Sequence, residues 1–212
     1  IMALNINGTT GISGVDGSVS APALTGTDSN TGITFPSADT IKFATGGVER
    51  MSITNSGVSG ITPGITHAST WYLTSSFTGS AIPVTALSAY TGAGAGTIGS
   101  AMTISSGIFT FPTTGIWYIQ VDTGFQLDGD SRYNRAEIRT TTDGSSYNYA
   151  HSPYAFIDDS GSSGLIYSNH HTGHLFDVVN TTDYKCRIQV EVNNGSTQTW
   201  MMKILFVRYG DT

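Results

Sequence analysis

Apolar and polar side chains alternate along several stretches of the chain, most regularly in its last 150 residues. The segment FTFPTTGIWYIQVDTGFQL, which begins at Phe109, places an apolar residue on nearly every second position. Because successive side chains of a β-strand point to opposite faces, this alternation predicts a strand that is buried on one face. The predicted buried set is Trp117, Ile119, Val121, Phe125 and Leu127, and the polar set is Gln120, Asp122, Gln126 and Asp128.

Turn residues divide the rest of this region into further strands. Asp143-Gly144 and Asn194-Gly195 are hairpin-type turn pairs, and no segment keeps the 3.6-residue period of a helix. Many short strands at this spacing predict an all-β fold of the sandwich or jelly-roll type. The predicted strands cover residues 67–76, 84–91, 100–111, 115–127, 133–141, 146–151, 171–179, 184–193 and 199–209.

The last predicted strand, TWMMKILFVRY, is apolar on both faces. A strand of this kind is buried on both faces, so one face is expected in the core and the other against a second copy of the chain. The face assigned to the core carries Trp200, Met202, Ile204 and Phe206. The interface candidates are Met201, Leu205, Val207 and Tyr209.

The first 62 residues differ in composition from the rest. Residues 1–30 are rich in Gly, Ser, Thr and Ala with isolated apolar residues, and we expect an extended arm that becomes ordered on a partner; a disordered tail is the alternative. Residues 31–62 contain short β-like pieces between turn signals. Because an isolated hairpin is marginal in water, we expect a β collar that closes when several chains pack together. Residues 63–212 form the predicted main domain.

Composition and charge exclude several classes of protein. Only 11% of the residues are charged, against about 25% in an average domain, which is typical of rigid β structures and fibrous assemblies. The net charge of −6 and the lack of a Lys/Arg patch argue against a nucleic-acid partner. No stretch approaches the roughly 18 apolar residues of a membrane span, and the N-terminus has no secretory-signal pattern. The single cysteine, Cys186, falls on a predicted buried position.

Two parts of the chain resemble known families. FTFPTTGIWYIQ, RAEIRTTTDG, HTGHLFDVVNTTDYKCRIQV and TWMMKILFVRYG resemble, in order, elements of C1q-like (tumour-necrosis-factor-like) jelly-roll domains, without that family's disulfides and collagen stalk. MALNINGTTGISGVDG and GITFPSADTIKFATGGVERMSITNSGVSGI are similar to segments of tail-fibre proteins of tailed bacteriophages, notably marine ones that infect cyanobacteria. Together the resemblances imply a homotrimeric virion fibre, made in the host cytoplasm, whose arm attaches to another virion protein and whose head binds a receptor.

Catalytic and cofactor-binding motifs are missing from the sequence. There is no G-x-S-x-G, H-E-x-x-H or Walker element, and GAGAG (Gly92–Gly96) reads as a flexible loop. We therefore expect no enzymatic activity and no cofactor. His170, His171 and His174 could bind zinc, but His170 and His171 would point to opposite faces of a strand. A pH-sensitive polar patch and inert surface histidines are the alternatives.

Three loops are expected to meet at the far end of the head if the strands alternate in direction. They are residues 128–132, 152–169 and 193–198. Carboxylates and amides beside aromatic rings suit a sugar or, with oxygen ligands, Ca²⁺; ordinary polar turns are the alternative. The receptor-binding candidates are Asp128, Asp130, Tyr154, Phe156, Asp158, Asp159, Asn193 and Asn194, with Tyr167 expected beside them.

The sequence therefore favours a non-enzymatic homotrimeric virion fibre that binds a host surface glycan or protein. A purely architectural head decoration or connector is one alternative. A polysaccharide depolymerase that uses paired carboxylates is another. Attachment to the tail and attachment to the capsid both stay open.

Overall fold

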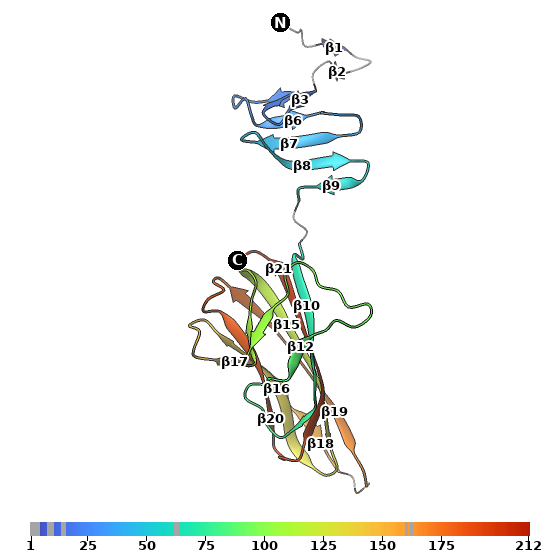
Figure 1. Cartoon of the computed structure of the whole chain (residues 1–212), viewed down its shortest axis with the longest axis vertical. Coiled ribbons are helices and arrows are strands. Elements are labelled where there is room, and N and C mark those ends of the chain that lie inside the picture. Colours follow the sequence, from blue (N-terminus) through green and yellow to red (C-terminus); the bar gives the residue numbers. More distant parts are fainter. Residues whose placement is uncertain (1–4, 8–10, 14–15, 62–63, 160, 162) are drawn as a thin grey trace. The chain divides into compact units, whose positions relative to one another are not determined.

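The chain forms two compact units, Ile1–Pro63 and Gly64–Thr212, each built from strands and turns in its described residues. Figure 1 shows the computed structural model with most of these strands labelled. The described residues are 5–7, 11–13, 16–61, 64–159, 161 and 163–212. The all-β fold that the alternation predicts is confirmed.

The first unit is built around an antiparallel sheet of five short strands in the order β5-β6-β7-β8-β9. Residues 16–30, which the sequence analysis assigned to an extended arm, contain three strands, and one of them, β5, pairs with β6. Residues 1–4, 8–10 and 14–15 of that arm lie outside the described residues. The strands are β1 (Asn5–Asn7), β2 (Gly11–Ser13), β3 (Gly17–Ser18), β4 (Ala21–Pro22), β5 (Leu24–Thr25), β6 (Gly32–Thr34), β7 (Ile41–Thr45), β8 (Val48–Thr54) and β9 (Gly57–Ser59).

One face of this five-stranded sheet is apolar and open to solvent in the single chain. The cross-strand register places Ile33, Phe43 and Met51 in one row and Ile41, Ile53 and Val58 in the next. Buried positions on the opposite face are small, namely Thr34, Ala44 and Ser52. Among the described residues of this unit, no second layer covers the apolar face. We call it the collar face.

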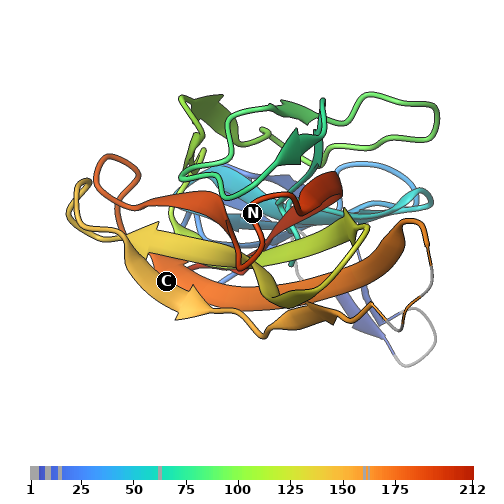
Figure 2. The same ribbon diagram turned by 90° about the horizontal axis from the view of Figure 1, so that it is seen from below.

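The second unit, which we call the head, is a sandwich of two antiparallel sheets. The first sheet has the order β12-β10-β21-β15-β19, with β11 also pairing with β21. The second has the order β13-β14-β20-β16-β17, with β18 also pairing with β16. The chain crosses repeatedly between the two sheets, as in a jelly roll. Figure 2 shows the same strands from below, with β19 in orange.

The head strands match most of the predicted ones, with two large differences. The strand predicted at 100–111 is two antiparallel strands, β13 (Thr103–Ser105) and β14 (Ile108–Thr110), joined by a turn at Ser106-Gly107 where both residues have positive φ. The strand predicted at 171–179 begins five residues earlier, at Ile166, and the preceding loop contains the short strand β18. The head strands are β10 (His67–Leu73), β11 (Phe77–Thr78), β12 (Leu87–Ala89), β13 (Thr103–Ser105), β14 (Ile108–Thr110), β15 (Gly115–Leu127), β16 (Ser131–Thr141), β17 (Asn148–His151), β18 (Ala155–Ile157), β19 (Ile166–Val178), β20 (Lys185–Val192) and β21 (Gln198–Gly210).

The core lies between the two sheets and is rich in aromatic rings. Trp117 packs against Phe111 with ring centroids 5.3 Å apart, and its indole N–H donates to the Thr113 carbonyl at 3.1 Å. The buried set predicted for β15 is confirmed, because each member is at most 5% exposed. Cys186 is also fully buried, and that burial raises the pKa of its thiol. It therefore serves as a small core residue.

A β-bulge in β21 corrects the predicted faces of the last strand. Gly124 pairs with Met201, whereas the next residue, Phe125, pairs with Thr199, so Trp200 is an extra residue without a partner on β15. An extra residue shifts the alternation of side chains on either side of it. The assignment of Trp200 to the core was therefore wrong, since its side chain lies on the outer face and is 41% exposed. The other expected core residues, Met202, Ile204 and Phe206, are buried.

Candidate functional site

The outer face of the first head sheet carries many apolar side chains, in two groups on either side of a polar row. Val207 lies in register between Ala68 of β10 and Tyr118 of β15, and the Tyr118 ring stacks on that of Tyr209 with centroids 6.1 Å apart. All four interface candidates from the sequence belong to this set. We call it the apolar face, formed by Tyr72, Tyr118, Tyr167, Leu175, Trp200, Met201, Leu205, Val207 and Tyr209.

Two glycines in strand interiors allow aromatic rings to lie close to the sheet. A Cβ atom at Gly124 would come within 2.6 Å of the Trp200 indole, and one at Gly173 within 2.3 Å of the Tyr118 hydroxyl oxygen. Glycine weakens a strand interior and marks the close approach of another group. Here the approaching groups are the rings of the apolar face. Since neither glycine has a Cβ atom, the Trp200 and Tyr118 rings lie close to the backbone of the sheet, and this part of the face is flat.

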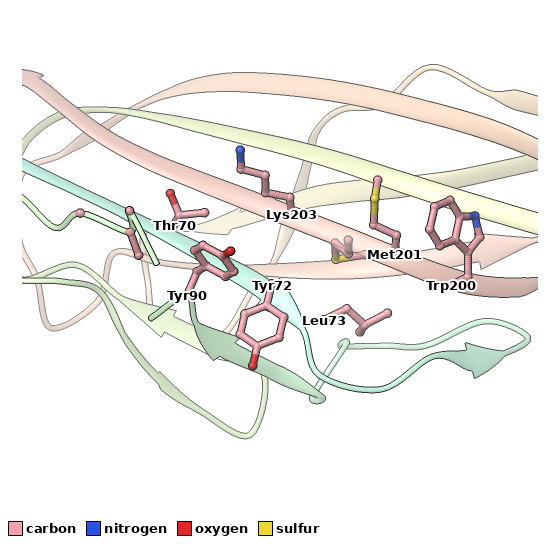
Figure 3. A pocket seen from close by; sticks show the side chains of 11 residues that line it. Thr70, Tyr72, Leu73, Tyr90, Trp200, Met201 and Lys203 are labelled. Carbon is pink, nitrogen blue, oxygen red and sulfur yellow. The ribbon is translucent and has the colours of Figure 1, made fainter. Parts of the chain in front are cut away.

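A hollow of about 560 Å³ opens beside the apolar face, and Figure 3 shows its lining. Trp200 and Met201 line it from β21, Tyr72 from β10, and Tyr90 from the end of β12. Tyr72 and Tyr90 meet edge to face, with ring centroids 5.7 Å apart. The backbone of Gly94–Gly96, within the GAGAG loop, completes the wall. Among the described residues that line it, Lys203 is the one ionisable group besides the tyrosines, so the hollow suits an apolar segment.

A row of polar groups crosses the middle of the apolar face. Asp122 lies in register between Lys203 and His171. The Asp122 carboxylate lies 2.6 Å from His171 Nδ1 and accepts a hydrogen bond from Gln120 Nε2 at 3.0 Å. Burial opposes ionisation of Asp122, but the hydrogen bonds from His171 and Gln120 outweigh it and lower the pKa of this carboxyl. Such a row fixes the alignment of any surface that packs here.

The three histidines of NHHTGH do not converge. His170 points into the sandwich, 4% exposed, and its Nε2 lies 2.9 Å from Ser152 Oγ and 2.8 Å from the Pro153 carbonyl oxygen. His171 points outward to Asp122, and His174 stacks on Phe176. Within the part of the chain that the structure describes, no group of three His, Cys, Asp or Glu side chains could hold a metal ion.

His170 makes the stability of the head sensitive to acid. Burial lowers its pKa below the ordinary value, so the unfolded chain takes up a proton as the pH falls through about 6.5 while the folded chain does not. Stability that is present above pH 6.5 is therefore lost as the pH falls toward the lower folded pKa. We expect His170→Gln to reduce the loss of stability between pH 7.5 and 5, measured by urea denaturation.

The control for this experiment is His171→Gln, because the His171 side chain is 61% exposed. This variant should keep the acid sensitivity of the wild type. Burial also lowers the pKa of His174, so His170→Gln is expected to remove part of the sensitivity and not all of it. An unchanged pH dependence in His170→Gln contradicts the assignment to His170.

The loops at the end of the head bring together part of the predicted receptor site. The Asp130 carboxylate accepts a hydrogen bond from the Asp159 amide at 2.5 Å, and Asn194 Nδ2 donates to the Asp130 carbonyl at 3.0 Å. Asp128 accepts from the Gly164 amide at 3.3 Å. Phe156 and Asp158 line a hollow beside Asp130 and Arg132. These candidates form one polar loop cluster with an exposed phenyl ring, Phe156.

Tyr154 and Tyr167 lie elsewhere. The Tyr154 hydroxyl accepts a hydrogen bond from Arg135 of β16 at 3.2 Å, on the outer side of the second sheet. Tyr167 belongs to β19 and meets the Trp200 ring edge to face, so it joins the apolar face. The expectation that Tyr167 lies with the loop cluster was wrong, because β19 begins at Ile166. The Asn193 backbone N–H donates a hydrogen bond to the Tyr133 carbonyl oxygen.

The sequence analysis missed an ion-pair network on the second sheet. Glu137 is 0% exposed, and its carboxylate lies 2.6 Å from Arg135 Nη2 and 2.7 Å from Arg139 Nη2. Gln189 Nε2 donates to the same carboxylate at 2.8 Å, and Arg135 also pairs with Glu191. The alternation R-x-E-x-R at 135–139 was a visible signal, because it places the three charges on one face of a strand.

Comparisons with known proteins identify no family for this chain. No protein-family model matches it, and no curated protein does. Among the described residues, no helix is long and apolar enough to cross a membrane.

Several solved structures have a similar fold. One is murine APRIL at pH 8.5, with 9% identity and a TM-score of 0.43 over 66% of this chain and 98% of that one. Another is the globular domain of zebrafish complement 1qA protein, with 13% identity and a TM-score of 0.41 over 68% and 96%. A third is the PRD1 vertex protein P5, with 12% identity and a TM-score of 0.41 over 69% and 99%. Likeness at this level carries no argument about partners or activity.

Proposed function

We propose that this chain is a non-enzymatic structural protein of a bacteriophage virion and works as a homotrimer. In this proposal its N-terminal residues attach to another virion protein, and its head binds a glycan or protein on the host surface. The observation that carries the proposal is the apolar face of the head. Exposed apolar patches with polar residues at their borders mark protein–protein interaction sites.

Two independent features support self-association. On the head, Trp200 and Tyr209 are 41% and 52% exposed at the two ends of β21, and flat aromatic surface of this kind is typical of interface cores. In the first unit the collar face is also apolar and exposed, with Val58 57% exposed. One assembly could cover both faces, since each belongs to the same chain. The resemblance of the head sequence to C1q-like domains is the ground for three copies.

A trimer also suits attachment to a cell surface. Linked binding sites raise avidity by about 10²–10⁴ over a single site, so individually weak contacts suffice. The loop cluster around Asp130, Asp159 and Asn194 and the exposed Phe156 are the receptor-binding candidates of this proposal. The virion assignment rests on the similarity of residues 2–17 and 32–61 to bacteriophage fibre segments.

The mass of the protein in solution tests the self-association. Light scattering at micromolar concentration should give three times the chain mass of 22.3 kDa. A mass of 22.3 kDa contradicts the proposal. Host binding is tested separately, by measuring whether the added protein blocks adsorption of bacteriophage particles to cyanobacterial cells. A trimer that leaves adsorption unchanged supports the purely architectural alternative.

A further inference from the structure

Four of the nine Lys and Arg residues of the chain lie on the outer face of the second head sheet. Arg139 of β16 lies directly opposite Arg187 of β20. Lys185 follows on the same side of β20, and Arg135 on the same side of β16. We call this set the basic face, formed by Arg135, Arg139, Lys185 and Arg187. Like charges directly opposite each other destabilise a sheet, so the Arg139–Arg187 pair requires compensation.

The compensation is uneven across the basic face. Arg135 and Arg139 both bind the buried Glu137. Arg187, by contrast, has no carboxylate oxygen within 4.0 Å among the described residues. Its buried Nε atom has no hydrogen-bond partner in the described part of the chain, and neither has the neighbouring Gln189 Oε1. Because Nε is buried, an anion from solution meets the Nη atoms of Arg187, and these pair with no described carboxylate within 4.0 Å.

The acidic residues at the end of this face are engaged in their own turns. Asp143 accepts hydrogen bonds from the amides of Ser145 and Ser146 at 2.9 and 2.7 Å. Asp183 accepts one from Asn180 Nδ2 at 2.8 Å. Neither forms an ion pair with Arg187 within 4.0 Å. These two carboxylates therefore do not neutralise the positive charge of Arg187, which is available to a ligand from solution.

Tyrosine rings hold the guanidinium groups in place. The Tyr147 ring centroid lies 4.4 Å from Arg187 Cζ, and Tyr149 lies 5.3 Å from Arg139 Cζ and 5.6 Å from Arg135 Cζ. Cation–π contacts of this length are attractive. Tyr149 is itself 44% exposed, so an aromatic surface adjoins the charged groups. A planar guanidinium binds carboxylate, sulfate and phosphate with two parallel hydrogen bonds.

We propose that the basic face binds an acidic polysaccharide, with Arg187 as the main contact to its anionic groups. The aromatic rings beside the guanidinium groups would pack against the apolar faces of the sugars. This inference rests on the proposed host-binding function and adds a second contact surface, distinct from the loop cluster. Single-stranded nucleic acid is the competing polyanion, and the test below includes it.

Binding of the full-length protein to dextran sulfate tests the proposal, with neutral dextran as the control polymer. We expect binding to dextran sulfate alone. Arg187→Gln should lower the affinity about tenfold, since a charge-assisted hydrogen bond is worth roughly 1.5–3 kcal/mol. Arg187→Lys, which keeps the charge and loses the planar fork, should lie between Arg187→Gln and the wild type. Arg50→Gln is the matched control, because Arg50 is an exposed arginine of β8 in the first unit, outside both the basic face and the loop cluster.

Several results would overturn the inference. They are equal binding of dextran and dextran sulfate, wild-type affinity in Arg187→Gln, an equal loss in Arg50→Gln, and tighter binding of a single-stranded oligonucleotide than of dextran sulfate. Thermal unfolding of each variant verifies that it is folded. If the protein binds dextran sulfate through Arg187 but does not affect adsorption of the particles to host cells, this result contradicts only the proposed function. If the Arg187→Gln protein blocks adsorption of the particles and binds dextran sulfate with wild-type affinity, this result contradicts only the present inference and not the proposed function.

Discussion

In the proposed trimer, Val207→Glu is expected to convert the head into a monomer. Val207 lies in the apolar face between Ala68 and Tyr118, so in the proposed trimer its side chain is enclosed by a neighbouring copy. A carboxylate there would be buried without a partner, at a cost of roughly several kcal/mol in each copy. Because the substitution recurs in all three copies, the interface loses this amount three times.

The measurement is light scattering of the fragment 64–212, which contains the whole core of the head. At micromolar concentration, Val207→Glu should have one third of the wild-type mass. Leu165→Glu is the matched control, because Leu165 is 54% exposed in the loop before β19 and lies outside the apolar face. A trimeric Val207→Glu fragment would contradict the proposed interface, and so would equal dissociation of the Leu165→Glu control.

Glu137→Ala is expected to destabilise the head by about 3–5 kcal/mol, the usual loss when one partner of a buried ion pair is removed. Glu137 is fully buried and binds Arg135 and Arg139. Without its carboxylate, two partly buried guanidinium groups stay close together and the Gln189 amide loses its acceptor. The truncation also leaves a space below the arginines.

Urea denaturation at one fixed protein concentration measures this effect, since the stability of an oligomer depends on concentration. The matched control is Glu191→Ala, which removes a carboxylate that is 39% exposed and pairs with Arg135 alone. Exposed ion pairs contribute about 0–1 kcal/mol, so the control should unfold close to the wild type. Equal losses in the two variants would show that burial of Glu137 is not the cause.

The alternation of side chains was sufficient to predict two of the central strands. The buried set of β15 was predicted residue by residue, the bounds of β20 were predicted within one residue, and Cys186 was placed in the core. Within a single strand, the face of each side chain depends only on its position in the chain. For the same reason, the sequence predicted that β21 has a second apolar face and predicted the four interface candidates on it.

The errors arose where two distant segments pair. Trp200 was assigned to the core because the bulge depends on the pairing of β21 with Gly124 and Phe125, more than 70 residues earlier in the chain. Tyr167 was expected in the loop cluster because nothing local shows that β19 starts at Ile166, where it pairs with Leu127. A strand boundary and a bulge are both set by the partner strand.

The candidate sites show the same division. The loop cluster could be predicted in part, because turn residues recur at the loop ends. The ion pairs of Glu137 with Arg135 and Arg139 had a local signal in R-x-E-x-R. The basic face had none, because Arg187 and Arg139 are brought together only by the pairing of β16 with β20. Their charges are distributed through the sequence without forming a local patch.

The sequence by itself determined the all-β class, the buried faces of the regular strands and the excess of apolar surface on β21, because these follow from a two-residue period within each strand. The tertiary structure alone decided which face Trp200 occupies, where Tyr154 and Tyr167 lie, and which guanidinium lacks a carboxylate. Those features depend on the register between strands, and register is a property of the pair.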